Sequence, residues 1–280
     1  MKVLITGAGG QLGRELVKVF SEAGYCVFPF KKEHLDITNQ QDIKLVFKLI
    51  TPDIVINAAA YTNVDECETE VEKAFHINGL GPYYLAKEAR VWKVSFYHIS
   101  TDYVFCGNKA SPYDEYDHAQ PKTVYGKSKR LGEELVLKTY ENSSIIRTSW
   151  LYGSIGEDFV KTMLKLSEEK SELKVVSDQL GSPTYTKDLA KTILKLINKP
   201  YKIYHVTNSG SCTWHDFAKE IFLISDRKTI IKPVTTLEYG SKVSRPNYSV
   251  LSHQELNKVG IKMRCWKEAI REYLKEELVN

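Results

Sequence analysis

The sequence predicts an α/β protein: a Rossmann-type, doubly wound parallel sheet followed by a smaller C-terminal lobe. Three observations support this prediction. Short apolar, β-branched runs alternate with helix-periodic stretches through the first 150 residues, which is the pattern of βαβ units. The glycine-rich stretch GAGGQLG follows the first apolar run and opens the first helix. After Trp150 the alternation gives way to shorter segments and turn-rich stretches.

The predicted strands are short apolar runs of the kind that a parallel sheet buries on both faces. They are Val3–Thr6, Cys26–Phe30, Ile54–Ala60, Ser95–Thr101 and Ser143–Thr148. The helices predicted between them are Leu12–Ala23, Asp42–Ile50, Val71–Val91 and Tyr125–Lys138. We also expect a further strand to end at the LDIT stretch, residues 35–38.

The second half of the chain contributes one more βαβ-like crossover and a separate group of elements. The crossover consists of a helix at Thr186–Asn198 and a strand at Ile203–Thr207. The other predicted elements are Asp158–Glu169, Lys174–Ser177, Trp214–Ile224 and Trp266–Leu278. We therefore predict a Rossmann domain at residues 1–150, joined by about 184–208, and a smaller lobe at 151–280.

Composition and charge exclude several classes of protein. The net charge is +4, and the lysines are scattered from Lys2 to Lys275 without a basic cluster, so no nucleic-acid partner is predicted. The five cysteines include no C-x-x-C pair and the seven histidines are dispersed, which favours reduced thiols and no metal site. The chain begins directly with a strand and has no bilayer-spanning segment, so we expect a cytoplasmic protein without a membrane partner.

The first glycine-rich stretch has the features of a dinucleotide-binding turn. Gly7, Gly10 and Gly13 follow the spacing G-x-x-G-x-x-G between an apolar strand and an amphipathic helix. Glycine permits a tight turn and close backbone approach, and the free N–H groups of a helix N-terminus attract a diphosphate. A glycine-rich turn without a ligand is the alternative interpretation.

The end of the second predicted strand bears on the choice of nicotinamide cofactor. NAD-binding folds usually place an acidic residue here to bond the adenosine ribose. This chain has Lys31 and Lys32 at that place, with Glu33 directly behind them. We therefore expect NADPH to be preferred and NADH to remain usable, because Glu33 can take the free ribose hydroxyl.

The pair Tyr125 and Lys129, in VYGKSK, is the candidate reacting centre. Residues at i and i+4 share a helix face whatever they do, and Tyr83 and Lys87 show the same spacing. Only the first pair follows a strand that ends in hydroxyl residues, Ser100 and Thr101 in ISTDYVF. Adjacent strand residues point to opposite faces, so only one of these two hydroxyls can serve.

The expected chemistry explains why these residue types occur together. A tyrosine can donate a proton, but its usual pKa near 10 is high for proton transfer near neutral pH. A lysine ammonium one helical turn away stabilises the phenolate and can also bond ribose hydroxyls. The pair is therefore typical of ketone reduction by a nicotinamide cofactor.

Seven motifs in order carry a closer resemblance. They are GAGGQLG, NAAAYTNVDECE, ISTDYVF, YGKSK, RTSWLYG, DQLGSPT and SRPNYS. Together they resemble the dTDP-4-dehydrorhamnose reductase family, of the extended short-chain dehydrogenase/reductase superfamily, over essentially the whole chain. The resemblance implies NAD(P)H-dependent reduction of the C4 ketone of dTDP-4-dehydro-L-rhamnose to dTDP-L-rhamnose, with the C-terminal lobe binding this nucleotide sugar.

The resemblance also assigns roles to individual residues. For the cofactor it implies Gly10, Gln11 and Leu12 at the diphosphate, Ala60, Tyr61 and Thr62 at its middle, and Asp36 and Ile37 at the adenine. At the reacting centre it implies Tyr125 as proton donor, Lys129 on the nicotinamide ribose, and Thr101 in preference to Ser100. For the substrate it implies Thr101, Asp102, Trp150 and Arg245. Trp150 as a core residue and Arg245 as a surface charge are the alternatives.

The sequence leaves the oligomeric state and two rival functions open. Some relatives form a magnesium-bridged dimer, but its acidic residues cannot be placed in this sequence, so we predict no metal and leave a homodimer open. A sugar-nucleotide epimerase or dehydratase of the same superfamily is one rival interpretation. A non-catalytic, NAD(P)-binding regulatory subunit of a methionine adenosyltransferase is the other.

Overall fold

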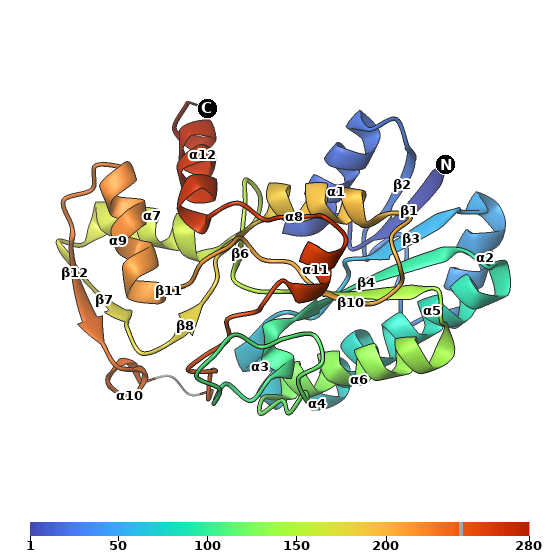
Figure 1. Ribbon diagram of the computed structural model, residues 1–280, viewed down its shortest axis with the longest axis horizontal. Coiled ribbons are helices and arrows are strands. Elements are labelled where there is room, and N and C mark those ends of the chain that lie inside the picture. Colours follow the sequence, from blue (N-terminus) through green and yellow to red (C-terminus); the bar gives the residue numbers. More distant parts are fainter. Residues whose placement is uncertain (241–242, 280) are drawn as a thin grey trace.

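The computed structural model describes residues 1–240 and 243–279. Its centre is a six-stranded sheet in the order β10-β5-β4-β3-β1-β2, in which neighbouring strands run parallel (Figure 1). The strands are β1 (Lys2–Thr6), β2 (Cys26–Phe30), β3 (Ile54–Asn57), β4 (Ser95–Thr101), β5 (Ser143–Thr148) and β10 (Ile203–His205). The predicted Rossmann-type, doubly wound sheet is therefore confirmed.

Helices cover both faces of this sheet, because each strand presents apolar side chains in both directions. On one face lie α1 (Gln11–Glu22) and α8 (Thr186–Leu196), which pack against each other as well as against the sheet. On the other face lie α2 (Gln40–Ile50), α5 (Gly81–Trp92) and α6 (Val124–Thr139) (Figure 1). The carboxyl ends of the strands meet at the edge of the sheet that faces the C-terminal lobe, where ligands of open α/β sheets bind.

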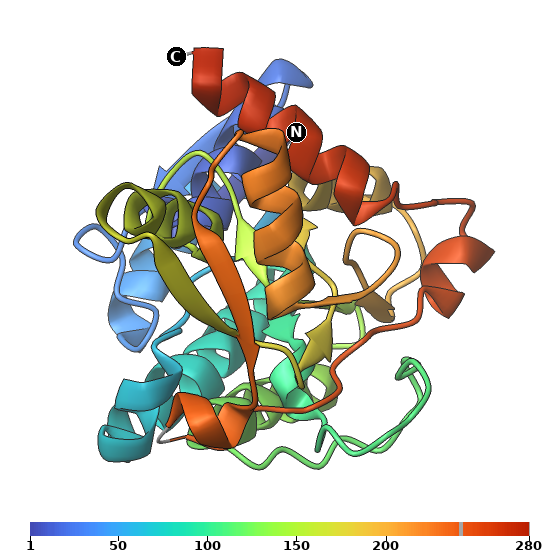
Figure 2. The same ribbon diagram turned by 90° about the vertical axis from the view of Figure 1, so that its left-hand side faces the viewer.

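The smaller C-terminal lobe has its own apolar core. It contains α7 (Phe159–Glu169), α9 (Trp214–Ile224) and α12 (Trp266–Val279), packed on a parallel pair of strands, β7 (Glu172–Val176) and β12 (Ile230–Val234) (Figure 2). Short strand pairs connect the lobe to the sheet: β6 (Leu151–Tyr152) with β9 (Thr184–Tyr185), and β8 (Leu180–Gly181) with β11 (Cys212–Thr213). The short helix α10 (Thr236–Tyr239) completes the lobe, whereas the short helix α11 (Gln254–Lys258) packs beside β10 and places Leu256 in the core of the sheet.

Three predicted elements differ from the structure. The strand expected to continue to Ala60 ends at Asn57, whose Oδ1 accepts the Ala59 backbone N–H at 3.1 Å. The strand expected to end at LDIT is absent, because the Asp36 carboxylate accepts the Thr38 backbone N–H at 2.9 Å and closes a turn. The other predicted strands and helices are present, and their ends differ from the predicted ends by at most a few residues.

The single helix expected at Val71–Val91 is three segments. They are α4 (Val71–Phe75), the π-helical turn η1 (His76–Leu80) and α5. A Cβ at Gly132 of α6 would lie 2.3 Å from the Asn78 carbonyl oxygen, so η1 and α6 approach at backbone distance. The Asn78 side chain bonds both backbone polar groups of Tyr61 and also donates to the Ser128 Oγ of α6 at 3.1 Å. The elements that were not predicted are the short helices α3 (Val64–Thr69), η2 (Asp102–Val104), α10 and α11, and the strands β6, β8, β9, β11 and β12.

Candidate active site

The turn between β1 and α1 requires glycine at two of its three motif positions. Gly7 has a φ of 68°, and a Cβ there would lie 2.5 Å from the backbone nitrogen of Ala59. A Cβ at Gly13 would lie 2.1 Å from the Gly7 carbonyl oxygen. The turn therefore lies against the end of β3 with no room for side chains. The first N–H groups of α1 have no side-chain cap, which suits an anion such as a diphosphate.

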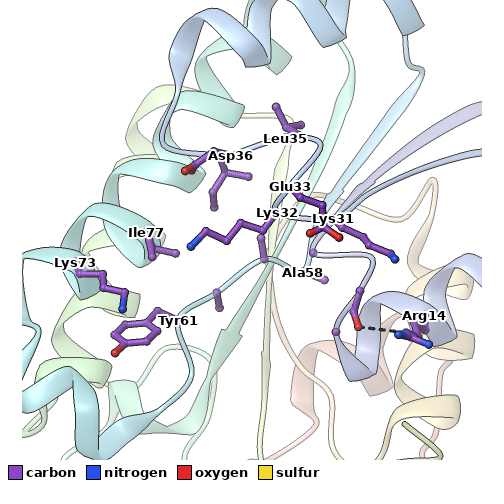
Figure 3. A pocket seen from close by; sticks show the side chains of 16 residues that line it. Arg14, Lys31, Lys32, Glu33, Leu35, Asp36, Ala58, Tyr61, Lys73 and Ile77 are labelled. Atoms are coloured by element: carbon purple, nitrogen blue, oxygen red, sulfur yellow. Dashed lines mark hydrogen bonds between the residues drawn. The ribbon is translucent and has the colours of Figure 1, made fainter. Parts of the chain in front are cut away.

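Two cavities open along the carboxyl edge of the sheet on either side of this turn. The first, which we call the open end, has a volume of about 580 Å³. It is lined by Gly7, Gly9, Gly10, Arg14, Lys31, Lys32, Glu33, Leu35, Asp36, Ile37, Ala58, Ala59, Ala60, Tyr61, Lys73 and Ile77 (Figure 3). Arg14, Lys31, Lys32 and Glu33 are all exposed at its rim.

Arg14 at the open end was not among the predicted site residues. Its Nε donates to the Gly9 carbonyl oxygen at 3.2 Å (Figure 3). The Lys31 side chain lies on the other side of Gly9, with its Cγ 3.4 Å from the position of a Cβ there. Lys31 and Arg14 therefore flank one glycine of the turn. The signal in the sequence was a basic residue directly after the last motif glycine.

The deeper wall of the open end is formed by predicted cofactor residues. Asp36 accepts two hydrogen bonds from Thr38, at 2.9 and 2.7 Å, which outweigh the effect of burial and lower the pKa of Asp36. Ile37 is buried against Gly81, where a Cβ would lie 2.6 Å from its Cδ1. Tyr61 lies beneath Lys73, whose Nζ is 4.4 Å from the ring centroid. This wall offers an apolar floor with a few fixed polar groups.

The second cavity, which we call the closed end, has a volume of about 540 Å³. It contains the predicted residues Gln11, Leu12, Gly13, Ala60, Thr62, Thr101, Asp102, Tyr125, Lys129 and Trp150. Ser149, Tyr103, Val64 and Glu157 also line it and were not predicted. The structure thus brings the glycine turn, the end of β4 and the Tyr-x-x-x-Lys face of α6 to one cavity.

The two hydroxyls at the end of β4 have different surroundings. The Ser100 Oγ donates its one hydrogen to the buried Glu133 Oε1 at 2.6 Å. Thr101 Oγ1 instead bonds the Asp102 carboxylate at 3.0 Å and is a hydrogen-bond partner of the Tyr125 phenol. The geometry therefore places Thr101, rather than Ser100, with the predicted proton donor.

Burial controls the protonation of the groups at the closed end. It raises the pKa of the Tyr125 phenol, against the effect of the Thr101 hydrogen bond, so the phenol is protonated at neutral pH. It also raises the pKa of Asp102 to about 6. Burial lowers the pKa of Lys129 to about 8, although the Glu133 carboxylate acts in the opposite direction. The Lys129 Nζ donates to the Ile99 carbonyl oxygen at 2.5 Å and lies 3.4 Å from the His98 Nε2.

The two predicted substrate residues of the second half lie in different places. Trp150 has a φ of 47° and lines the closed end, with its ring stacked on Trp214 at a centroid distance of 3.5 Å. It also packs against the apolar core of the C-terminal lobe, so both interpretations of Trp150 have a structural basis. Arg245 does not line the closed end; its Nη2 pairs with Asp65 at 3.1 Å at a neighbouring pocket.

The second Tyr-x-x-x-Lys pair lies elsewhere. Tyr83 and Lys87 are on α5, and neither lines the open end or the closed end. Tyr83 is half-buried beside Tyr84, and Lys87 is exposed. Identical spacing on two helices therefore gives one pair in a cavity and one on a packing surface.

The site combines three features that together define a class of enzyme. They are a glycine turn on a parallel sheet, a hydroxyl at a strand end, and Tyr-x-x-x-Lys on the next helix. This class is the NAD(P)-binding oxidoreductases of the extended short-chain dehydrogenase/reductase type. Comparison with known proteins narrows this class. Residues 1–279 match the family described as RmlD substrate binding domain, and the chain belongs to this family.

Named relatives cover nearly the whole chain. The spore coat polysaccharide biosynthesis protein SpsK of Bacillus subtilis is 55% identical over 98% of this chain and 97% of its own. The dTDP-4-dehydrorhamnose reductase of Aggregatibacter actinomycetemcomitans is 40% identical over 96% and 97%. A crystal structure of dTDP-4-dehydrorhamnose reductase from Bacillus anthracis in complex with NADP superposes with a TM-score of 0.96, at 43% identity over 98% and 99%.

Proposed function

We propose that the chain is an NAD(P)H-dependent reductase that converts dTDP-4-dehydro-L-rhamnose to dTDP-L-rhamnose. The observation that carries this proposal is that Thr101, Tyr125 and Lys129 line one cavity with the glycine turn. The names of two relatives, at 40% and 43% identity, supply the substrate.

A nicotinamide cofactor fits the residues of this cleft. The glycine turn leaves room only for backbone, and the uncapped N-terminus of α1 faces the junction of the two cavities. The turn would hold the diphosphate, Asp36 and Ile37 the adenine, and Lys129 the nicotinamide ribose. When bound, the reduced cofactor supplies a hydride equivalent to the ketone carbon.

The residues of the chain supply the proton and the positioning. As the C4 carbonyl π bond breaks, the oxygen takes the proton of the Tyr125 hydroxyl, and solvent restores that proton afterwards. Thr101 bonds the phenol oxygen and orients it, while the Lys129 ammonium would stabilise the transient phenolate. Trp150 would lie against the sugar, and Asp102 would bond it.

We further propose that NADPH is preferred over NADH. Four exposed cations line the open end: Arg14, Lys31 and Lys32, near which the ribose phosphate of NADPH would lie, and Lys73, over the Tyr61 ring. One carboxylate, Glu33, lines the same rim and favours the free hydroxyl of NADH. The Bacillus anthracis relative was crystallised with NADP, which supports the same choice.

The test is a spectrophotometric assay of NAD(P)H consumption with dTDP-4-dehydro-L-rhamnose, with the product identified by mass spectrometry and NMR. Wild-type protein should consume one NADPH per dTDP-L-rhamnose formed, and Tyr125→Phe should not. Absence of turnover by folded, cofactor-binding wild type would refute the proposed substrate. Stoichiometric NAD that survives dialysis would instead favour an epimerase or dehydratase. Co-purification with a methionine adenosyltransferase, without ketone reduction, would favour the regulatory subunit.

A further inference from the structure

A row of buried polar side chains runs from the sheet to the predicted catalytic lysine. Asn57 at the end of β3 and His98 in β4 are directly paired in register, and α6 places Lys129 beside His98. The side chains of Thr6, Asn57, His98 and Lys129 are all at most 2% exposed. Since buried polar groups are costly when unpaired, the hydrogen-bonding roles in this row can be worked out one by one.

The orientation of the Asn57 amide is fixed first. Its oxygen accepts the backbone N–H of Ala59 at 3.1 Å and the Thr6 hydroxyl at 2.6 Å. A backbone N–H cannot accept a hydrogen bond, so the amide cannot be turned over without loss of this contact. The Asn57 nitrogen therefore faces the His98 Nδ1, at 3.0 Å, and must donate to it.

This orientation fixes the tautomer of His98. Nδ1 accepts from Asn57, so the hydrogen of the neutral imidazole is on Nε2. The ring stays neutral, because burial holds the pKa of His98 well below its usual value. The Nε2–H then faces the Lys129 Nζ, 3.4 Å away.

An Nε2–H group and an ammonium are both donors, so they do not satisfy each other. A neutral Lys129 amine fits, because its lone pair accepts from Nε2–H while one of its own hydrogens goes to the Ile99 carbonyl oxygen at 2.5 Å. The charged groups around Lys129 do not remove this preference for the uncharged amine. Glu133, on its own helix, favours the ammonium, but Glu133 is already paired with Arg147 of β5 at 2.7 Å. Tyr125, one turn earlier, is a neutral phenol.

We propose that His98 is a positioning residue that favours the uncharged amine of Lys129, and that the uncharged fraction of Lys129 takes up a proton when the lysine exchanges His98 for the ribose hydroxyls of the cofactor. This inference rests on the proposed function, in which Lys129 binds the ribose. Ribose hydroxyl oxygens accept from an ammonium, whereas the Nε2–H of His98 does not. Cofactor binding would thereby charge the lysine that the phenolate needs, before the ketone is reduced.

Isothermal titration with NADP⁺ in buffers of different ionisation enthalpy counts the protons taken up. Burial lowers the pKa of Lys129 to about 8, so wild type should take up a measurable fraction of a proton per bound NADP⁺ at pH 8.5, and less as the pH falls toward 7, where Lys129 is already mostly ammonium. Lys129→Met should reduce this to near zero. In Asn57→Asp the new carboxylate accepts a hydrogen bond from the His98 Nδ1–H, so the His98 Nε2 becomes an acceptor. Lys129 is then already charged before the cofactor binds, and the proton uptake on binding NADP⁺ should fall severalfold. His205→Asn, a buried histidine of β10 bonded to Arg147, is the control that leaves uptake unchanged.

The outcomes separate this inference from the proposed function. Binding of NADP⁺ without proton uptake in wild type, or unchanged uptake in Lys129→Met or Asn57→Asp, overturns the role of His98 and leaves the reductase proposal standing. Failure to bind NADP⁺ refutes the cofactor assignment itself, and the inference with it. If Asn57→Asp does not fold, long-range ¹H–¹⁵N spectra of wild-type His98 decide: an Nε2–H tautomer supports the inference, and an Nδ1–H tautomer overturns it.

Discussion

The two ends of the cleft differ in how they hold charge. At the closed end Thr101 and Lys129 are almost fully buried. The charged groups behind them, Glu133 and Arg147, are also buried. At the open end Arg14, Lys31 and Lys32 are exposed and make few fixed contacts. The closed end is built on β4 and α6, and the open end on α1 and the loop after β2; both ends carry charged residues, and they differ in solvent access.

This difference determines how large the effect of a substitution should be. A buried polar or charged group depends on its few partners, and removing one of them leaves the other unpaired at high cost. An exposed cation is screened by salt and competes with water, so its contribution is small. Substitutions at the closed end should therefore be severe and specific, whereas those at the open end should be graded and salt-dependent.

The largest effect should come from the ion pair that supports the closed end. Arg147 bonds Glu133 through Nε at 2.8 Å and Nη2 at 2.7 Å, and both side chains are buried. Arg147→Met leaves the Glu133 carboxylate buried with only its Arg130 and Ser100 contacts. We expect the free energy of unfolding, measured by urea denaturation, to fall by about 3–5 kcal/mol.

A double variant tests whether burial is the reason. Arg147→Met/Glu133→Leu removes both charges, so its loss should be clearly smaller than that of Arg147→Met alone. The matched surface pair is Lys228 and Asp226, each side chain being 85% exposed. Lys228→Met should change stability by less than about 1 kcal/mol. Equal losses for the two single variants would remove the proposed difference between buried and exposed charge.

The next largest effect concerns catalysis at the closed end. Tyr125→Phe removes the proposed proton donor but keeps the ring, which packs edge-on against Tyr103 at 5.5 Å. We expect kcat to fall by at least about 100-fold, with an unchanged Kd for the cofactor and an unchanged melting temperature. Tyr83→Phe, at the same motif position on α5, should be nearly silent. Equal losses from both variants would refute the assignment of Tyr125.

These two ends also differ in what the sequence could predict. Strand positions and the Tyr125–Lys129 pair followed from short-range patterns, because apolar runs and i, i+4 spacing are local properties. The buried contacts of the closed end are not local: strand register brings Asn57 to His98, and the packing of α6 on β4 brings Lys129 to His98. Their polar character was visible in the sequence, but their partners were not.

The incorrect predictions have the same origin. LDIT has an apolar, β-prone composition, yet the Asp36 side chain closes a turn with Thr38 that no periodicity reports. The π-helical turn at His76–Leu80 depends on the close approach of Gly132 to Asn78, more than 50 residues away in the chain. β12 forms a two-stranded pair with β7 among the described residues, and three of its five residues are exposed, so it lacks the buried apolar run of a central strand.

A smaller effect is expected at Trp150, between the cleft and the C-terminal lobe. A ring against the sugar should contribute to substrate binding, so Trp150→Ala should raise the KM for the nucleotide sugar by at least about tenfold without changing the cofactor Kd. Trp214→Ala is the control, since Trp214 stacks on Trp150 but does not line the closed end. If both variants only lower the melting temperature, with unaltered kinetics, then Trp150 is a core residue of the lobe.

The smallest effect should occur at the open end. An exposed ammonium beside a phosphate contributes about 1 kcal/mol in a partly solvated cleft, and less as salt is added. We therefore expect kcat/KM for NADPH to exceed that for NADH by roughly tenfold or less, and Lys31→Ala/Lys32→Ala to lose most of this preference. Lys73→Ala, which removes an exposed ammonium over the Tyr61 ring in the same cavity, is the control that should leave the ratio of the two cofactors unchanged. The preference of wild type should also shrink as ionic strength rises, whereas the Tyr125→Phe defect should not. A wild-type preference for NADH, or a double lysine variant that keeps the full NADPH preference at every salt concentration, would show that these lysines are only solvated surface residues.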